Sequence, residues 1–459
     1  MSKKTESAHS VSTAQQPNSV RQCEATMKKE CDNSGTSLKK IDIWTKRIPR
    51  VRRTIRTKST TLSNSRILLG KRSKYLLQML CIGAFLLSGC SATESVLVPD
   101  PSPIVEEVTD TEDLPERTKS VTGYYASWMK GAWLDMDLSV YDRMVFFSTT
   151  SASDGSLLER NGWPHAWVSL LARTDSLDIP VVPSLALLDA DSIRTLFSSM
   201  EFIDRLIASS LQLIEESKGQ GLHLDIEYFE VASDTVRSHF QHFTDSLAQT
   251  VEIDWPSAHL SMFVPAFDYG GLYDLAKIHP RYDELIVQGY DLHWQTGPRA
   301  GPVSPISGWG DDNWQRVLDR YLDAGVSPDR ITMSVPYFGY EWPVETAYPG
   351  SPTRGDGLIV TFGSVDPLVL PQYQISAQDR IRDYGSLRDD ESGSPYYTFE
   401  DSTGVWQGWY EDDVSLRHKY QFVLDRGLGG VATFPIGYDQ GQLDPLLLDA
   451  FGYPRRHKR

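Results

Sequence analysis

Three titratable side chains share one short stretch near the middle of the chain. His223, Asp225 and Glu227 occupy every second position of residues 221–227, with apolar residues between them. Because alternate side chains of a β-strand project to the same face, these polar groups would lie together. The plain interpretation is a half-buried strand with a solvated face. The apolar flanks and the preceding helical pattern instead favour a buried parallel strand, in which ionisable groups need a reason to be there.

Eight strand-like segments of this kind follow one another from Val121 onward, separated by amphipathic stretches such as residues 236–251 and 314–324. The strand-like segments are residues 122–126, 144–148, 180–187, 221–227, 259–265, 284–290, 331–337 and 430–434. Strands alternating with helices predict an α/β fold, and eight strands over about 330 residues favour a (β/α)8 TIM barrel. A doubly wound open sheet is the alternative.

The segment between the last two predicted strands is unusually long. Residues of about 340–412 are polar and rich in Gly, Pro and Tyr. Compact domains seldom contain a structureless loop of this length. We therefore expect a small α+β insertion on the upper rim of the barrel, between strands 7 and 8.

Aromatic residues gather where the predicted strands end. In a barrel, the residues that close each strand at its C-terminal end face the active site. The rings at these ends include Tyr124, Phe267, Tyr290, Trp294, Trp342 and Phe434. Some of them will belong to the core. Rings can stack on the apolar faces of sugars while polar groups bond the hydroxyls, so the pattern indicates a carbohydrate ligand.

These residues resemble glycoside hydrolase family 18, the chitinase-like barrels. The strand-four signature of that family is D-G-x-D-x-D-x-E, and residues 220–227 read Q-G-L-H-L-D-I-E. Further matches are G-Y-Y at residues 123–125, Q-G-Y-D-L-H-W at 288–294, P-Y-F-G-Y-E-W-P at 336–343 and G-G-V-A-T-F-P-I-G-Y-D at 429–439. The third of these is similar to a subgroup that includes spore-germination hydrolases. The resemblance covers Val121 to about Gly452.

The resemblance implies a catalytic role for each conserved motif residue. Glu227 would be the general acid that protonates the departing glycosidic oxygen. Asp225 would orient the 2-acetamido group of the substrate, whose carbonyl oxygen attacks the anomeric carbon in a substrate-assisted, retaining route. Tyr290 would hydrogen-bond the acetamido oxygen. The charge of Asp225 would also raise the pKa of its neighbouring acid.

The same resemblance implies a set of substrate-binding residues. These are Tyr124, His223, Asp291, Trp294, Trp342 and Phe434. Gln220 and His223 replace the first two aspartates of the signature, and Phe434 replaces the tryptophan that floors the catalytic subsite. His223 has two interpretations: a hydrogen-bond partner of Asp225, or a satisfied core histidine. Phe434 keeps an apolar face but loses area and the indole N–H.

The N-terminal part differs in composition from the rest. Residues 1–90 carry 18 Lys and Arg against 5 Asp and Glu, whereas the remainder carries 27 against 56. We expect residues 1–66 to be a disordered basic leader and residues 91–120 to be a flexible acidic linker. The alternative for residues 1–66 is a misassigned start codon, in which case this leader is not translated. The acidic folded part, predicted at residues 121–459, argues against nucleic-acid binding.

Residues 67–90 have the layout of a lipoprotein signal peptide. Basic residues precede an apolar run that is short for a membrane span and ends in Leu-Ser-Gly-Cys90. This ending resembles the bacterial lipoprotein box, which implies lipidation of Cys90 and removal of everything before it. No other cysteine follows Cys90, so we expect no disulfide. By resemblance to the sorting rule of enteric bacteria, Ser91 in place of aspartate favours the outer membrane over the inner one, within a location in the cell envelope or at the cell surface.

Several functions are disfavoured by motifs that the sequence lacks. It contains no H-E-x-x-H, paired cysteines, EF-hand spacing or G-x-S-x-G elbow, so we expect no metal and no cofactor. The favoured prediction is a monomeric, membrane-anchored glycosidase acting on glycans that contain β-linked N-acetylglucosamine, either chitin-like or peptidoglycan. The alternatives are a catalytically silent, lectin-like lipoprotein on the same barrel and an envelope scaffold without a sugar ligand.

Overall fold

The computed structural model describes residues 116–364 and 375–454. The basic leader, the signal peptide with Cys90 and nearly all of the predicted linker lie outside these residues. Within the described ranges, no helix combines the length and the apolar character that crossing a membrane requires.

The centre of the fold is a closed barrel of eight parallel strands. These are β1 (Ser120–Ala126), β2 (Arg143–Ser151), β4 (Val181–Leu187), β5 (Gly221–Ile226), β6 (His259–Val264), β7 (Glu284–Val287), β8 (Ile331–Pro336) and β14 (Gly430–Phe434). They pair in the order β1-β14-β8-β7-β6-β5-β4-β2, and β1 also pairs with β2. This last pairing closes the ring, so the (β/α)8 barrel is confirmed and the open sheet is excluded. Strand β3 (Leu157–Glu159) pairs with β2 in antiparallel fashion.

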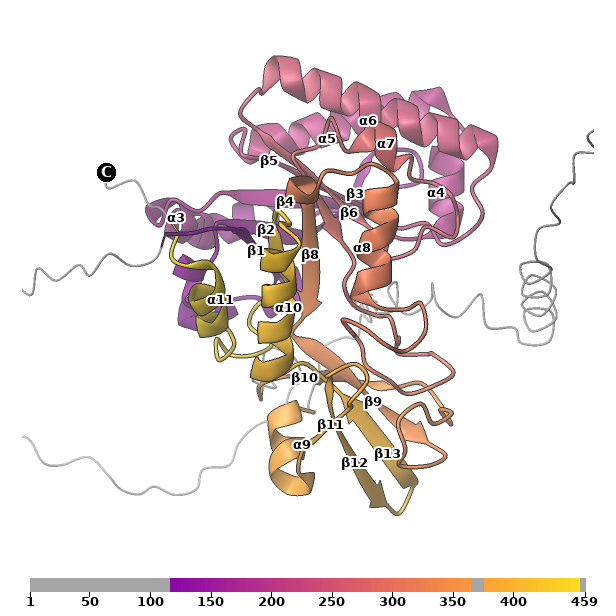
Figure 1. Cartoon of the computed structure of the whole chain (residues 1–459). Helices are drawn as coiled ribbons and strands as arrows, with labels where there is room; N and C mark the ends of the chain where they lie inside the picture. The colour runs from indigo at the N-terminus through magenta and orange to yellow at the C-terminus, as the bar shows by residue number, and fades with distance from the viewer. Residues whose placement is uncertain (1–115, 365–374, 455–459) are drawn as a thin grey trace, which may run out of the picture. The chain divides into compact units, whose positions relative to one another are not determined.

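Helices occupy the connections between the strands and surround the barrel (Figure 1). The α-helices outside the insertion are α3 (Val168–Ser176), α4 (Ala190–Leu196), α5 (Met200–Glu216), α6 (Asp234–Asp254), α7 (Leu275–Ile278), α8 (Trp314–Asp323), α10 (Asp413–Asp425) and α11 (Asp444–Phe451). Short 3-10 helices are η1 (Ser127–Met129), η2 (Ala132–Asp135), η3 (Leu138–Val140), η4 (His165–Trp167) and η5 (Pro328–Arg330). The helices predicted at residues 236–251 and 314–324 are present as α6 and α8, and the helical pattern before residue 221 is α5.

Local chemistry explains where these two helices begin. The Ser233 side chain accepts a hydrogen bond from the backbone N–H of Val236 at the start of α6, and that of Asn313 accepts one from Arg316 at the start of α8. Such N-caps satisfy backbone donors that have no partner inside the helix. Helix α6 buries Phe240, among other apolar residues, against the rest of the fold. The caps and the buried stripe together fix the connections that follow β5 and precede β8.

The predicted α+β insertion is confirmed between β8 and β14. It consists of β9 (Phe338–Val344), β10 (Leu358–Thr361), α9 (Ala377–Tyr384), β11 (Leu387–Arg388), β12 (Pro395–Asp401) and β13 (Gly404–Trp409). The strands form an antiparallel sheet in the order β10-β9-β13-β12-β11. Inside it, the buried Glu341 carboxylate accepts two hydrogen bonds from Arg380, at 2.7 and 2.8 Å, and one from the Tyr397 hydroxyl at 2.7 Å. Helix α9 is therefore joined to the sheet by a charged pair whose oxygens are satisfied.

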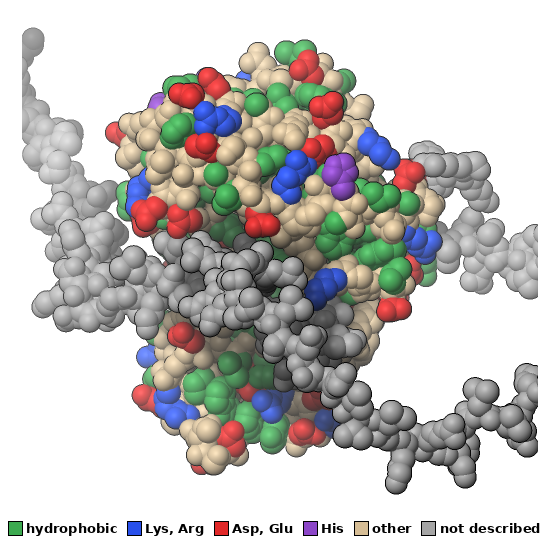
Figure 2. Space-filling model, turned by 180° about the vertical axis from the view of Figure 1, so that it is seen from behind, with side chains coloured by type: hydrophobic (Ala, Val, Ile, Leu, Met, Phe, Trp, Pro, Cys, Tyr) green, Lys and Arg blue, Asp and Glu red, His purple; other side chains and the backbone are tan. Residues whose placement is uncertain are grey.

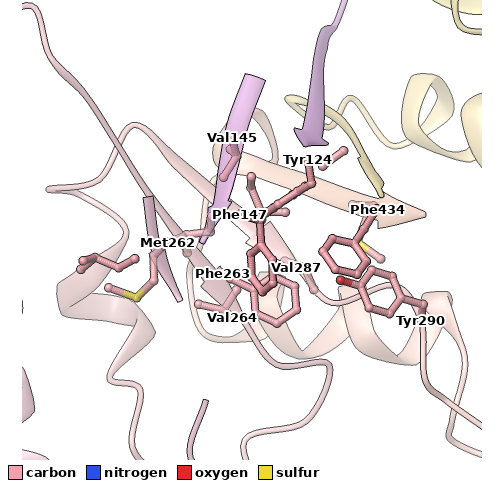
Figure 3. Close-up of a cluster of buried hydrophobic side chains, with 14 of the residues drawn as sticks. Tyr124, Val145, Phe147, Met262, Phe263, Val264, Val287, Tyr290 and Phe434 are labelled. Carbon is pink, nitrogen blue, oxygen red and sulfur yellow. The ribbon is translucent and has the colours of Figure 1, made fainter. Parts of the chain in front are cut away.

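The barrel interior is filled by apolar and aromatic side chains. Figure 3 shows Phe147, Tyr290 and Phe434 meeting inside the ring of strands, with Tyr124 beside them. Every residue of β5 is buried, as the apolar flanks predicted. Helices cover the outer face of the parallel strands, while barrel residues cover the inner face, so even the polar residues of β5 are removed from water. On the outer surface, Figure 2 shows acidic and basic side chains spread over one face of the protein.

Candidate active site

Strand β5 brings the predicted acidic residues into a buried setting. Asp225 is 3% exposed and Glu227 is 8% exposed. Asp225 pairs with Ala186 of β4, and the backbone N–H of Glu227 donates to the carbonyl of Leu187 at 3.1 Å. This bond continues the β4 pairing beyond the last residue of β5. The backbone of Glu227 is therefore tied to β4, although this residue lies one position beyond β5.

His223 is a satisfied core histidine. Its Nε2 lies 2.9 Å from the Tyr124 hydroxyl, and its Nδ1 lies 2.9 Å from the Ser261 hydroxyl. Burial lowers the pKa of His223 to about 3, so the ring is neutral at physiological pH. Since both ring nitrogens have partners, the alternative hydrogen bond to Asp225 is absent, and His223 does not line the pocket described below. Contact of His223 with substrate stays a prediction, which these hydrogen bonds do not support.

Asp225 has an unsatisfied oxygen. Among the described residues, its Oδ1 is buried and has no hydrogen-bond partner. Burial raises the pKa of Asp225 from its ordinary value of 3.8 to about 7. Buried polar atoms are nearly always hydrogen-bonded, so an oxygen left without a partner indicates a place for a donor from outside the protein. A neutral or charged Asp225 can therefore exist near pH 7, depending on what binds beside it.

A pocket of about 180 Å³ lies beside Glu227, the second acid of the Asp225–Glu227 pair. Four predicted site residues line it, namely Glu227, Tyr290, Asp291 and Trp294. The structure therefore brings the general-acid candidate together with three residues from the chain that follows β7. Tyr124, Phe434, Asp225, His223 and Trp342 are not among its lining residues.

Tyr290 and Phe434 form the aromatic support behind this pocket. Their rings stack at 5.9 Å between centroids, and Tyr124 packs edge-on against Phe434 at 5.6 Å (Figure 3). Burial raises the pKa of the Tyr290 phenol well above its usual range, and Asp291 raises it further. Tyr290 thus keeps its proton and can donate a hydrogen bond. Phe434 is 5% exposed and its ring stacks on one side of Tyr290; contact of Phe434 with substrate stays a prediction.

A hydrogen bond joins the insertion to the pocket wall. Tyr340 of β9 donates its hydroxyl to Asp291 Oδ1 at 2.6 Å. Asp291 has a backbone φ of +59°, in the left-handed region that Asp and Asn tolerate better than most other residues. The hydrogen bond and the backbone conformation together fix the turn that leads from Tyr290 to Trp294.

The side chains of Trp342 and Gln220 form hydrogen bonds with the backbone of neighbouring segments. Trp342 is 0% exposed, and its indole N–H donates to the carbonyl of Gln295 at 2.9 Å. Substrate contact by Trp342 stays a prediction, which this burial does not support. Gln220, at the first aspartate position of the signature, accepts a hydrogen bond from the backbone N–H of Val181 at 2.8 Å. It ties the start of β5 to β4, away from the chemistry.

The pocket also contains residues that the sequence analysis missed. Phe229, Tyr269, Gln288 and Asp312 line it. Phe229 lies two positions beyond Glu227, so the same alternation could have indicated it. Tyr269 and Asp312 lie on connections outside the strands and helices, where no periodic pattern marks a residue as facing the site. Within the described residues, no group of three or more His, Cys, Asp or Glu side chains is arranged to hold a metal ion.

A closed (β/α)8 barrel with a buried Asp-x-Glu pair beside an aromatic pocket at the strand ends defines a glycosidase-type protein. The family described as glycosyl hydrolases family 18 matches residues 189–439, which is more than half of the chain. The protein belongs to this family and is a chitinase-like hydrolase.

Individual relatives are distant. The chain is 20% identical over 324 residues to the cortical fragment-lytic enzyme of Bacillus anthracis, covering 67% of either protein. It is 24% identical over 325 residues to "Probable chitinase 10" of Drosophila melanogaster, a match that covers 67% of this chain and 13% of that protein. The whole-protein activity of these relatives therefore does not transfer directly.

Solved structures support the fold. A chitinase from Chromobacterium violaceum is 20% identical with a TM-score of 0.59, over 74% of this chain and 100% of that one. A Cycas revoluta family 18 chitinase in complex with allosamidin is 17% identical with a TM-score of 0.61, over 72% and 100%.

Proposed function

We propose that this protein hydrolyses glycans containing β-linked N-acetylglucosamine, chitin-like or peptidoglycan-derived, with retention of anomeric configuration. The observation that carries the proposal is the pair on β5: Glu227 lines the pocket, and Asp225 lies buried with one oxygen that lacks a protein partner. A structure of the Cycas revoluta chitinase holds an N-acetylglucosamine tetramer, which supports this ligand class by family membership.

In the proposed mechanism the substrate supplies its own nucleophile. Glu227 protonates the glycosidic oxygen as the bond to the anomeric carbon breaks. The acetamido carbonyl oxygen attacks that carbon from the opposite side, and Asp225 Oδ1 accepts a hydrogen bond from the acetamido N–H. The Tyr290 hydroxyl donates to the acetamido oxygen. Water then opens the cyclic intermediate, with Glu227 now acting as the base.

The remaining candidates position these groups. Asp291 and Trp294 shape the pocket beside the reacting sugar. His223 holds Tyr124 through the hydroxyl bond, and Phe434 supports the Tyr290 ring. We further propose that the chain needs no metal, because the substrate carbonyl supplies the nucleophile and Glu227 serves first as the acid and then as the base.

The test is hydrolysis of soluble N-acetylglucosamine oligomers and of peptidoglycan fragments, with product lengths read by mass spectrometry. The Glu227→Gln variant should lose turnover by roughly 10²–10⁴-fold while it still binds oligomers, since it keeps the shape of the acid but not its proton. Glu230→Gln is the matched control, because Glu230 is a partly exposed acid three residues along the chain that pairs with Arg194. If the native chain binds but cleaves none of these glycans, the protein is a lectin; if it does neither, the proposal fails.

We also propose that the chain is anchored to the cell envelope through lipidated Cys90, outside the described residues, and acts as a monomer. The Leu-Ser-Gly-Cys sequence that follows an apolar run supports the lipid anchor. Metabolic labelling with a clickable fatty acid in a bacterial host should label the native chain and not the Cys90→Ser variant. Cys81→Ser, from within the same apolar run, should still be labelled. Labelling that survives Cys90→Ser would contradict the anchor.

A further inference from the structure

Gln288 brings an amide group into the pocket beside Glu227. It directly follows β7, is half-buried, and lines the pocket together with Glu227 and Tyr290. Its side-chain Oε1 accepts a hydrogen bond from the backbone N–H of Ala266 at 3.4 Å. Among the described residues, no oxygen accepts a hydrogen bond from its Nε2. The amide therefore has two N–H donors to offer to a ligand.

The backbone N–H of Ala266 determines which way this amide faces. Turning the amide over would place the Nε2 hydrogens of Gln288 against that N–H, so that two donors would meet. Ala266 itself lines the pocket, so the amide lies at the pocket wall. Because Oε1 is turned to the backbone, Nε2 is the end of the side chain that is left for the pocket.

The backbone around Gln288 is fixed on both sides. Its own N–H donates to the carbonyl of Val264 on β6 at 2.9 Å. The next residue, Gly289, accepts a hydrogen bond from the Trp314 indole at 2.7 Å, and its N–H donates to the Ser334 hydroxyl at 3.1 Å. Groups that are held in place before binding lose little freedom when a ligand arrives, so the amide is suited to recognition.

The pocket lies on the leaving-group side of the scissile bond. Glu227, which contacts the glycosidic oxygen in the proposed mechanism, lines it, whereas Asp225 and Phe434 do not. Tyr290 lies at the boundary, because it lines the pocket while its ring stacks on Phe434. The reacting sugar, whose acetamido group Asp225 would hold, is therefore on one side of Glu227, and the departing sugar is on the side of Gln288.

The surroundings of the amide favour a neutral acceptor on an apolar group. The rings of Phe267 and Tyr269, 5.7 Å apart between centroids, line the same pocket. A donor that a ligand removes from water needs a new acceptor, since a buried unpaired polar group is costly. The carbonyl oxygen of an acetamido group is such an acceptor, and its methyl group can pack on rings. The ammonium group of glucosamine carries donors only, so it cannot accept from Nε2.

We propose that Gln288 is a specificity-determining residue: its Nε2 donates a hydrogen bond to the acetamido carbonyl oxygen of the departing sugar, so that the enzyme selects N-acetylglucosamine over glucosamine at that position. The inference rests on the proposed function and adds the recognition of a second N-acetyl group, beside the one that Asp225 would hold.

The test is digestion by the full-length chain of a β-linked polymer that contains both N-acetylglucosamine and glucosamine. Each cleavage makes the reacting sugar a new reducing end and the departing sugar a new non-reducing end. Sequencing of the products by tandem mass spectrometry therefore reads the two positions separately. A change in the composition of one end alone distinguishes recognition at that position from a general loss of activity.

We expect N-acetylglucosamine to be enriched at both new ends. Gln288→Met keeps the length of the side chain but removes the donor, and should lower the preference at the non-reducing end by roughly 3- to 10-fold while the reducing end stays N-acetylated. Gln288→Glu places a carboxylate there and should shift the non-reducing end towards cationic glucosamine. Gln295→Met is the matched control, because the amide of Gln295 already donates to the carbonyl of Gly357 at 2.7 Å and does not line the pocket.

The specificity proposal is overturned if the native chain shows no preference at the new non-reducing end. It is also overturned if Gln288→Met keeps that preference, as it would if the amide met only hydroxyl groups, or if Gln295→Met changes it equally. Failure of the proposed function looks different, because the native chain then cleaves nothing. In that case, calorimetry with N-acetylglucosamine and glucosamine tetramers decides: an affinity ratio that Gln288→Met reduces keeps the recognition by Gln288, and an unchanged ratio removes it.

Discussion

The Tyr340 hydroxyl of the insertion donates a hydrogen bond to Asp291 Oδ1 at 2.6 Å, so the inserted sheet is bonded to the wall of the candidate pocket. Asp291 is the residue after Tyr290, and its left-handed backbone turns the chain towards Trp294. The insertion thus has a part in positioning the proposed acetamido-binding tyrosine.

We predict that Tyr340→Phe lowers kcat/KM by roughly 10-fold, because a small displacement of Tyr290 weakens contacts formed at the reacting sugar. Stability should fall by only about 0.5–1.5 kcal/mol, the usual value of one hydrogen bond. Tyr397→Phe is the control: it removes a similar hydroxyl–carboxylate bond, to Glu341 within the inserted sheet, at 2.7 Å. Steady-state kinetics and urea unfolding of both variants separate positioning from stability. Equal losses of kcat/KM would argue against a positioning role.

Replacing His223 by Leu should destabilise the protein by about 2–4 kcal/mol. The change leaves the buried hydroxyls of Tyr124 and Ser261 without their imidazole partner, and each unsatisfied group carries a desolvation cost. His223→Gln, which can still reach one of the two hydroxyls, should lose less. Urea unfolding at pH 7.5 measures the free energy of unfolding of both variants. An unchanged value for His223→Leu would show that the two hydrogen bonds do not contribute to stability.

Because His223 is buried and neutral, the free energy of unfolding should fall in acid. Because burial lowers its folded pKa to about 3 from an ordinary 6.5, only the unfolded chain gains a proton as the pH drops through 6.5. The stabilisation is therefore complete above pH 6.5 and is lost progressively towards pH 3. His223→Gln should flatten this part of the stability–pH curve relative to the native chain. An unchanged slope would contradict a buried neutral histidine.

The contribution of Asp225 to stability should depend on pH in the opposite direction. Its folded pKa, raised by burial to about 7 from 3.8, favours the protonated form in the native state. This stabilisation is present below pH 4 and is lost as the pH rises to 7. Asp225→Asn should therefore be more stable than the native chain at pH 8, on the order of 1–3 kcal/mol, and nearly equal at pH 4.5. Thermal melts at the two pH values test this, and turnover should be lost in the same variant.

The sequence predicts the barrel well because its strands are apolar runs of similar length between amphipathic helices. All eight strand positions are confirmed, including β5 with its buried polar face. The insertion is also predictable, because a polar segment as long as residues 340–412 needs structure of its own.

The site is only partly predictable. Alternation along residues 221–227 places Asp225 and Glu227 on one face, and the structure buries both side chains; their catalytic roles stay predictions. The same rule places His223 on that face but does not reveal that Tyr124 and Ser261 take both of its nitrogens, because these partners come from β1 and β6. Asp312 lies on a connection whose path depends on tertiary contacts, so local pattern carries no signal for it.

Nuclear magnetic resonance of the first product formed from an N-acetylglucosamine oligomer tests the central claim most directly. Substrate-assisted catalysis with Glu227 as the acid predicts that the β-anomer appears first and converts to the α-anomer only by slow mutarotation. It also predicts no product from the Glu227→Gln variant on the same timescale. Initial release of the α-anomer would show inversion, and full activity of Glu227→Gln would remove Glu227 from the mechanism; either result would contradict the account.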